Sequence, residues 1–234
     1  MCAVNRARRP GPRPGKFTAA VPRDVSGLPY HAALSPHDGA LAAGDDYDAC
    51  HFAGVTFDDA AAASSRFTEC AFSDVVVDGG QYRKSRFTDV WLRDVRLLSA
   101  DMAETGWLDA SFLDCAAAGV QMFGSALRRV VFHGCKLDSV NFRASVLTDI
   151  VFEDCLLRDA DFGGATLERV HFAGSRLTSA DFTKAAMTDV DLRGAEFGIA
   201  AGYDSLRGAV IDSVQLVALA PLLAAHMGIT VTDA

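Results

Sequence analysis

Large apolar residues recur at every fifth position over most of this chain. In the stretch ADFGGATLERVHFAGSRLTSADF, residues 160–182, they are Phe162, Leu167, Phe172, Leu177 and Phe182. The same register runs from Tyr47 to Phe197, which makes 31 units without an insertion or deletion. Two residues before each centre the chain carries a small or compact residue, such as Cys70, Ser145 or Ala160. This period constrains the fold more than any other feature of the sequence.

A spacing of five fits neither regular element. A helix turns about 100° per residue, so a five-residue step rotates about 140° and scatters the large residues around the helix. A strand alternates with a period of two, so successive centres would face opposite sides of a sheet. A chain that turns a corner in every unit can instead point all centres into one interior. The sequence therefore predicts an all-β solenoid.

The units ADFGG (160–164) and ADFTK (180–184) resemble the A(D/N)LXX consensus of the pentapeptide-repeat family. The resemblance covers about two thirds of the chain. It implies a right-handed quadrilateral β-helix with four units per coil and about eight coils. The centres also alternate strictly between leucine and phenylalanine from Leu127 to Phe182. This alternation independently favours an even number of units per coil, because phenylalanine then stacks on phenylalanine.

The sequence divides into three parts. Residues 1–40 are expected to be a basic, proline-rich and disordered tail, because the six cations of residues 1–25 oppose only Asp24. Residues 41–203 are expected to form the β-helix. Residues 204–234 are expected to form a helical cap: residues 211–228 predict a helix with Asp212 or Ser213 as N-cap and Gly228 as stop. Pro221 should kink this helix or divide it into two.

The C-terminal helix is apolar almost all round, so it should either plug the last coil or pair with a second chain. In gyrase-directed members of the family a C-terminal helical module makes a head-to-head dimer, so the resemblance favours a homodimer. The residues expected at this interface are Val214, Leu216, Val217, Leu219, Leu222, Leu223 and Met227.

The expected folded body is strongly acidic. Residues 26–234 contain 16 cations and 29 acids, a net charge of 16 minus 29, or −13. With four units per coil, nine acids fall into two columns on neighbouring corners. One holds Asp74, Asp94, Asp114 and Asp154, and the other holds Glu69, Asp89, Asp109, Asp149 and Asp189.

These columns suggest DNA mimicry. Duplex DNA carries about 22 charges over the roughly 37 Å expected for this rod, which is the same order as the charge of the body. Together with the resemblance, this predicts a non-enzymatic protein that binds DNA gyrase or another type II topoisomerase. It would modulate the enzyme or protect it from quinolones or gyrase toxins, as a cytoplasmic homodimer.

A scaffold or adaptor function is the alternative. Residues 115–148 have a net charge of +3, and the nearby outward positions between residues 91 and 156 are unusually apolar. This apolar girdle consists of Trp91, Leu98, Leu108, Leu113, Phe123, Val131, Val146, Val151 and Leu156. A cluster of this kind could bind another protein.

No catalytic, cofactor or metal site is expected. His51, His133 and His171 fall at outward positions that are mostly whole coils apart, and the cysteines fall in the small buried slot. Carboxylate pairs such as Asp159 with Asp161 follow from the repeat itself. We expect no direct nucleic-acid binding by the body and no membrane association, because no apolar run approaches the roughly 18 residues of a membrane span.

Overall fold

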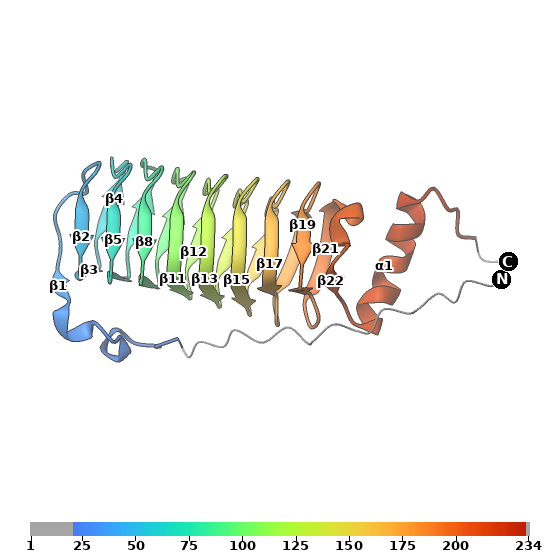
Figure 1. Cartoon of the computed structure of the whole chain (residues 1–234), viewed down its shortest axis with the longest axis horizontal. Coiled ribbons are helices and arrows are strands. Elements are labelled where there is room, and N and C mark those ends of the chain that lie inside the picture. Colours follow the sequence, from blue (N-terminus) through green and yellow to red (C-terminus); the bar gives the residue numbers. More distant parts are fainter. Residues whose placement is uncertain (1–20, 233–234) are drawn as a thin grey trace, which may run out of the picture.

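The computed structural model describes residues 21–232, in which parallel β coils stack into a rod (Figure 1). Paired strands are displaced by 20 residues, as in Phe52 opposite Phe72 and Leu127 opposite Leu147. Twenty residues are four units of five, so each coil has four walls. The predicted quadrilateral solenoid of about eight coils is confirmed.

The walls are numbered here by the central residues of one coil: Phe67 in wall 1, Phe72 in wall 2, Val77 in wall 3 and Tyr82 in wall 4. Wall 1 contains β2 (Asp46–Asp48), β5 (Arg66–Thr68), β8 (Arg86–Thr88) and β19 (Ala186–Thr188). Wall 2 contains β1 (Ser35–Pro36), β3 (Cys50–Ala53), β6 (Ala71–Ser73), β9 (Trp91–Arg93), β20 (Val190–Asp191) and β22 (Ala209–Val210).

Four longer strands run through walls 1 and 2: β11 (Gly106–Leu113), β13 (Ala126–His133), β15 (Val146–Glu153) and β17 (Thr166–His171). Wall 3 contains β4 (Thr56–Asp58), β7 (Val76–Asp78), β10 (Arg96–Leu98), β12 (Ala116–Ala118), β14 (Lys136–Asp138), β16 (Leu156–Arg158), β18 (Arg176–Asp181) and β21 (Glu196–Ala201). Wall 4 pairs through isolated bridges, such as Gln81 with Asp101.

The backbone conformation at the corners explains the period of five. Every fifth residue from Gly44 to Gly194 has a positive φ, between 44° and 78°. This left-handed conformation turns the chain from one wall to the next, and glycine and aspartate tolerate it better than most residues. One such residue per unit gives one corner per unit.

Stacked rings fill the interior. The ring centroids of Phe132 and Phe152, one coil apart on wall 2, are separated by 4.9 Å, and those of Phe152 and Phe172 by the same distance. From Ser65 to Ala195, the small residue two positions before each centre is also buried. Where it is polar it is hydrogen-bonded: the Ser85 hydroxyl donates to the Ala62 carbonyl at 2.7 Å. The predicted like-on-like stacking is therefore present.

Part of the chain expected to be disordered is ordered. Residues 25–27 and 31–33 form the short helices η1 (Val25–Gly27) and η2 (His31–Ala33), and β1 pairs with β3. The prediction of a disordered tail over residues 1–40 is wrong for residues 21–40, because these residues pack on wall 2. Residues 1–20 lie outside the described part of the chain.

The C-terminal end closes with η3 (Tyr203–Leu206), β22 and α1 (Ser213–His226). β22 pairs with β20, so the solenoid extends beyond the predicted boundary at residue 203. Asp212 caps α1 and forms a reciprocal capping box with Gln215. Pro221 was expected to kink the helix or divide it into two; the division is wrong, because proline removes one backbone donor and the helix continues to His226. None of the helices in residues 21–232 has the length and hydropathy needed to cross a membrane.

Candidate partner-binding surface

The structure assembles the nine predicted acids into two columns along the rod. All nine are corner residues with φ between 50° and 57°. The first acidic column contains Glu69, Asp89, Asp109, Asp149 and Asp189, and the second contains Asp74, Asp94, Asp114 and Asp154. Members of a column lie one or more coils apart, at about 4.8 Å per coil. The left-handed corner favours aspartate, so these acids have a conformational cause as well as an electrostatic effect.

Glycines complete the second acidic column, and the sequence analysis did not single them out. A Cβ atom at Gly134 would lie 2.5 Å from Oδ1 of Asp114, and one at Gly174 would lie 2.2 Å from Oδ1 of Asp154. The two carboxylates therefore lean onto the backbone of the next coil, where glycine leaves the room they need. No basic residue occupies this corner from Gly54 to Gly194.

Arginines interrupt the first acidic column. Arg129 pairs with Asp109 through Nε–Oδ1 and Nη2–Oδ2 distances of 2.6 and 2.5 Å, and Arg169 pairs with Asp149 at 2.5 and 3.0 Å. The hydrogen bonds from Arg169 lower the pKa of Asp149. Partial burial, and then the charge of Asp109, raise the pKa of Asp89. The column has five acids and two arginines, a net charge of −3. Because neighbouring coils are displaced by 20 residues, the step from Asp109 to Arg129 could have revealed this ion pair from the sequence.

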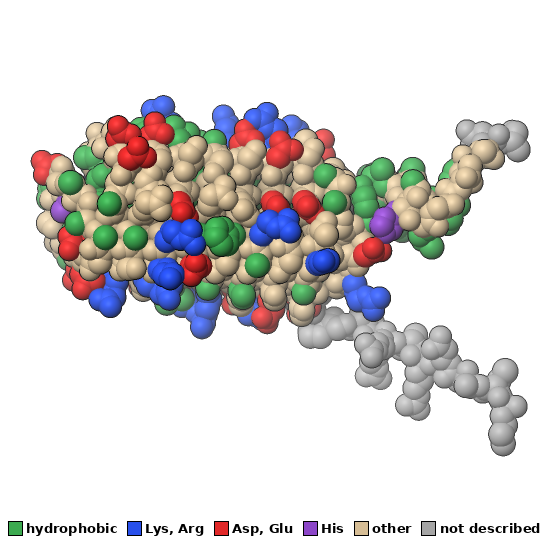
Figure 2. Space-filling view, turned by 90° about the horizontal axis from the view of Figure 1, so that it is seen from above, with side chains coloured by type: hydrophobic (Ala, Val, Ile, Leu, Met, Phe, Trp, Pro, Cys, Tyr) green, Lys and Arg blue, Asp and Glu red, His purple; other side chains and the backbone are tan. Residues whose placement is uncertain are grey.

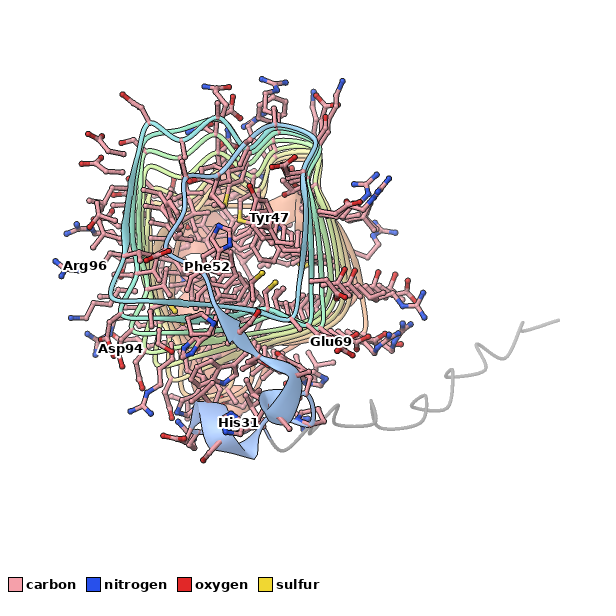
Figure 3. All side chains as sticks on the ribbon, turned by 90° about the vertical axis from the view of Figure 1, so that its left-hand side faces the viewer. His31, Tyr47, Phe52, Glu69, Asp94 and Arg96 are labelled. Atoms are coloured by element: carbon pink, nitrogen blue, oxygen red, sulfur yellow. The ribbon has the colours of Figure 1, made fainter. Side chains whose placement is uncertain are left out.

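The N-terminal segment, residues 21–36, covers the start of the wall between the columns. Figure 3 shows this segment, marked by His31, crossing outside the wall that joins the Asp94 corner to the Glu69 corner. The indole Nε1 of Trp91 donates a hydrogen bond to the carbonyl of Pro22 at 2.9 Å. The first coils of wall 2 are therefore not free for a partner while the segment is in place.

The predicted apolar girdle does not form one patch in the described residues. Trp91 and Leu113 are 2% and 1% exposed, because the N-terminal segment covers them. Val131 is also buried, and Leu98, Leu108 and Val151 are half-buried. The exposed members are Phe123 on wall 4, Val146 on wall 1 and Leu156 on wall 3. On the face seen in Figure 2, charged side chains of both signs are interspersed.

The helix α1 closes the rod with one face and leaves the other exposed (Figure 1). The side-chain amide of Gln215 donates hydrogen bonds to the carbonyls of Leu192 and Ala195 at 2.6 and 2.7 Å. Leu219 is 3% exposed, so its prediction as a dimer contact is wrong: it packs inward beside Gln215. Leu223 is half-buried. A groove of ≈ 410 Å³ separates part of α1 from residues 194–196 of the last coil.

The remaining predicted dimer residues are exposed. Val214, Val217 and Met227 are exposed by 77%, 74% and 73%, and Leu216 and Leu222 by 52% and 44%. These side chains make α1 the most apolar exposed element among the described residues. The helix thus packs on the last coil with one face, and its other face is exposed.

His51 and His133 make side-chain contacts on wall 2, and the cysteines of the rod lie in the slot two residues before the centres. Nδ1 of His133 lies 3.0 Å from Oε2 of Glu153, and Nε2 of His51 lies 3.0 Å from the Ser73 hydroxyl. Burial lowers the pKa of His51. Cys115, Cys135 and Cys155 are buried in one column. Across residues 21–232, no three His, Cys, Asp or Glu side chains are grouped so as to hold a metal ion.

Comparison with known proteins gives a family match over part of the chain and a fold. Residues 125–200 match the family described as "Pentapeptide repeat region". The sequence matches none of the curated proteins. Two trypsin-treated forms of QnrB1, a plasmid-mediated fluoroquinolone resistance protein, are similar in structure. One is 20% identical, with a TM-score of 0.55, and covers 84% of this chain and 99% of its own. The other is 19% identical, with a TM-score of 0.53, and covers 81% and 99%. The predicted pentapeptide-repeat resemblance is confirmed.

Proposed function

We propose that this pentapeptide-repeat chain is a non-enzymatic cytoplasmic protein that binds DNA gyrase or another type II topoisomerase by presenting a DNA-like acidic surface. It modulates the enzyme or protects it from quinolones or gyrase toxins. The observation that carries the proposal is the second acidic column, in which Asp74, Asp94, Asp114 and Asp154 repeat at one corner without a basic residue between them.

The spacing of this column supports mimicry. Coils follow one another at about 4.8 Å along the rod, while the phosphates of one DNA strand follow one another at about 3.4 Å along the helix axis. A protein groove that tracks a DNA backbone would therefore meet negative charge at a comparable interval. The structural similarity to QnrB1, a fluoroquinolone resistance protein, supports the proposed link to quinolones.

The exposed face of α1 supports a homodimer. Val214 and Val217 lie one helical turn apart and are each exposed by more than 70%. Burying such a face against a second copy would remove it from water and would place two rods end to end. A dimer of this kind doubles the length of acidic surface that a topoisomerase meets.

A supercoiling assay with purified gyrase, with and without a quinolone, tests the proposal. The protein should change supercoiling or reduce drug-induced cleavage. Asp114→Asn with Asp154→Asn should weaken the effect, because asparagine keeps the left-handed corner and removes the charge. The matched control is Asp59→Asn with Asp159→Asn, which makes the same change at the corner between walls 3 and 4.

The result that would sink the proposal is an unchanged gyrase reaction at micromolar protein. Equal losses in the two double variants would also contradict it, because the effect would then depend on total charge and not on the column. The adaptor alternative is not favoured, since the exposed girdle residues Phe123, Val146 and Leu156 lie on three different walls.

A further inference from the structure

We propose that wall 2 is a docking surface for a basic peptide with an apolar anchor, and that its resident occupant is this chain's own N-terminal segment. The segment then competes with any partner for the wall between the two acidic columns. This last consequence rests on the proposed function, whereas the docking itself does not.

An apolar cluster outside the solenoid core anchors the segment. Leu28 is 7% exposed and packs with Ala71, Trp91 and Leu113, which are 0%, 2% and 1% exposed. These three residues belong to the outer side of wall 2, where a solenoid side chain ordinarily meets water. A tryptophan and a leucine buried there are explained by the segment that covers them.

The polar contacts of the segment come mainly from side chains of the wall. Besides the bond from Trp91 to Pro22, Nη1 of Arg93 donates to the carbonyl of Arg23 at 2.7 Å. Backbone pairing with the wall is confined to one end, where the Ser35 amide donates to the Ala49 carbonyl at 2.9 Å. Between residues 24 and 34, the backbone bonds of the segment are internal turns of η1 and η2. Residues 21–34 can therefore leave the wall without breaking the backbone pairing of the solenoid.

Charge complements the apolar anchor. From Ser35 the segment runs back along the chain to Pro22, which lies against Trp91, three strands further along wall 2 in the order β1, β3, β6, β9. The sequence before this point carries Arg6, Arg8, Arg9, Arg13 and Lys16. Beyond Trp91, Asp114 and Asp154 flank the wall on one side, and Asp109 and Asp149, which pair with Arg129 and Arg169, flank it on the other. The sequence before residue 21 therefore carries a charge opposite to that of the second acidic column.

The fluorescence of Trp91 tests the docking in the full-length chain. Trp107→Phe makes Trp91 the only tryptophan and suits the stack, because the Trp107 ring lies on Phe87. In this background, Leu28→Asp should raise acrylamide quenching of Trp91 several-fold. Leu28→Ala should shift the equilibrium between covered and exposed Trp91 about tenfold toward the exposed form. Val146→Asp, an equivalent change at an exposed position, should leave quenching unchanged. Unchanged quenching in Leu28→Asp would overturn the proposal.

A synthetic peptide of residues 1–34 provides the second arm. Added to the full-length Leu28→Asp variant, it should restore the protection of Trp91, and it should bind more weakly in about 1 M salt, where screening is strong. The same peptide with Leu28→Asp is the control. Failure of the unmodified peptide to protect Trp91 at saturating concentration contradicts a docking surface.

The gyrase assay separates this inference from the proposed function. If the segment competes with gyrase, the Leu28→Asp variant should act at a lower protein concentration than the parent chain. If the parent chain and the Leu28→Asp variant act on gyrase at equal concentrations, although Trp91 is exposed in the variant, competition for wall 2 is refuted. If neither affects gyrase, the proposed function fails, and the fluorescence and peptide experiments alone decide the docking.

Discussion

Arg129 and Asp109 lie one coil apart and form a bidentate ion pair at a corner of the rod. Arg169 and Asp149 repeat the arrangement two coils further on. Both pairs are partly exposed, and ion pairs near the surface contribute at most about 1 kcal/mol to stability. Their main effect is therefore to reduce the negative charge of the first acidic column.

Removing both arginines should strengthen the proposed interaction. Arg129→Gln with Arg169→Gln changes the net charge of the column from −3 to −5, so half-maximal action on gyrase should need less protein. The control is Arg158→Gln with Arg176→Gln, which removes two paired arginines from wall 3. An equal gain in the control pair would show that only total charge matters. Urea unfolding should differ by less than about 1 kcal/mol in either case.

The Arg169–Asp149 pair should also make the stability of the fold depend on pH in the acidic range. Because Arg169 lowers the pKa of Asp149 in the folded chain, the pair stabilises the protein above the ordinary aspartate pKa. That contribution is lost as the pH falls through the lowered folded-state pKa. Thermal unfolding followed from about pH 5 down to about pH 2 should therefore drop less steeply in Arg169→Gln than in the parent. Parallel curves for the two proteins would argue against this account.

The packing of α1 against the last coil should depend on the hydrogen bonds of the Gln215 side-chain amide. Gln215→Met keeps the length of the side chain but leaves the carbonyls of Leu192 and Ala195 without a donor. The free energy of unfolding in urea should fall by about 1–3 kcal/mol, the penalty of unsatisfied buried polar groups. Gln81→Met, at an exposed position of wall 4, should change it by less than about 0.5 kcal/mol.

The aromatic stack should tolerate a change of shape better than a cavity. Phe152→Ala should lower the free energy of unfolding by about 3–5 kcal/mol, because the ring is fully buried between Phe132 and Phe172. Phe152→Leu should cost less, since Leu92 and Leu192 already occupy the same wall. Phe123→Ala, at an exposed site, serves as the control in the same urea titration. Equal losses of unfolding free energy in Phe152→Ala, Phe152→Leu and Phe123→Ala would contradict this account of the packing.

The exposed face of α1 should control the oligomeric state. Val214→Glu with Val217→Glu places two charges on that face without touching Gln215 or Leu219, so the chain should sediment as a monomer with its helix intact. Val146→Glu with Leu156→Glu makes the same chemical change on the walls and should leave a dimer. A parent chain that already sediments as a monomer would rule out the dimer.

The period of five was sufficient to predict the solenoid, because each unit solves the same local problem. The central residues, the small buried slot and the stacking of Phe132, Phe152 and Phe172 all follow from the one left-handed residue that recurs in each unit of five. The two acidic columns follow as well, since a displacement of 20 residues fixes which corners stack. The helix start at Asp212 was predictable from local capping chemistry.

The N-terminal segment was not predictable from its own residues. Its prolines and arginines are typical of disordered chains, and the contact that orders it joins Pro22 to Trp91, 69 residues away. Trp91 carried the only signal, as a large aromatic residue at an outward position. Leu219 was misplaced for a similar reason: an almost uniformly apolar helix does not reveal which side meets the last coil.

The left-handed corners have an evolutionary consequence. Their side chains point away from the interior, and in this chain aspartate, glutamate, lysine, arginine, serine, alanine and glycine all occupy them. A mutation at a corner can therefore change the charge at one point of the rod without repacking any ring. Natural selection can revise the surface that a partner meets, coil by coil, while the scaffold beneath it is inherited unchanged.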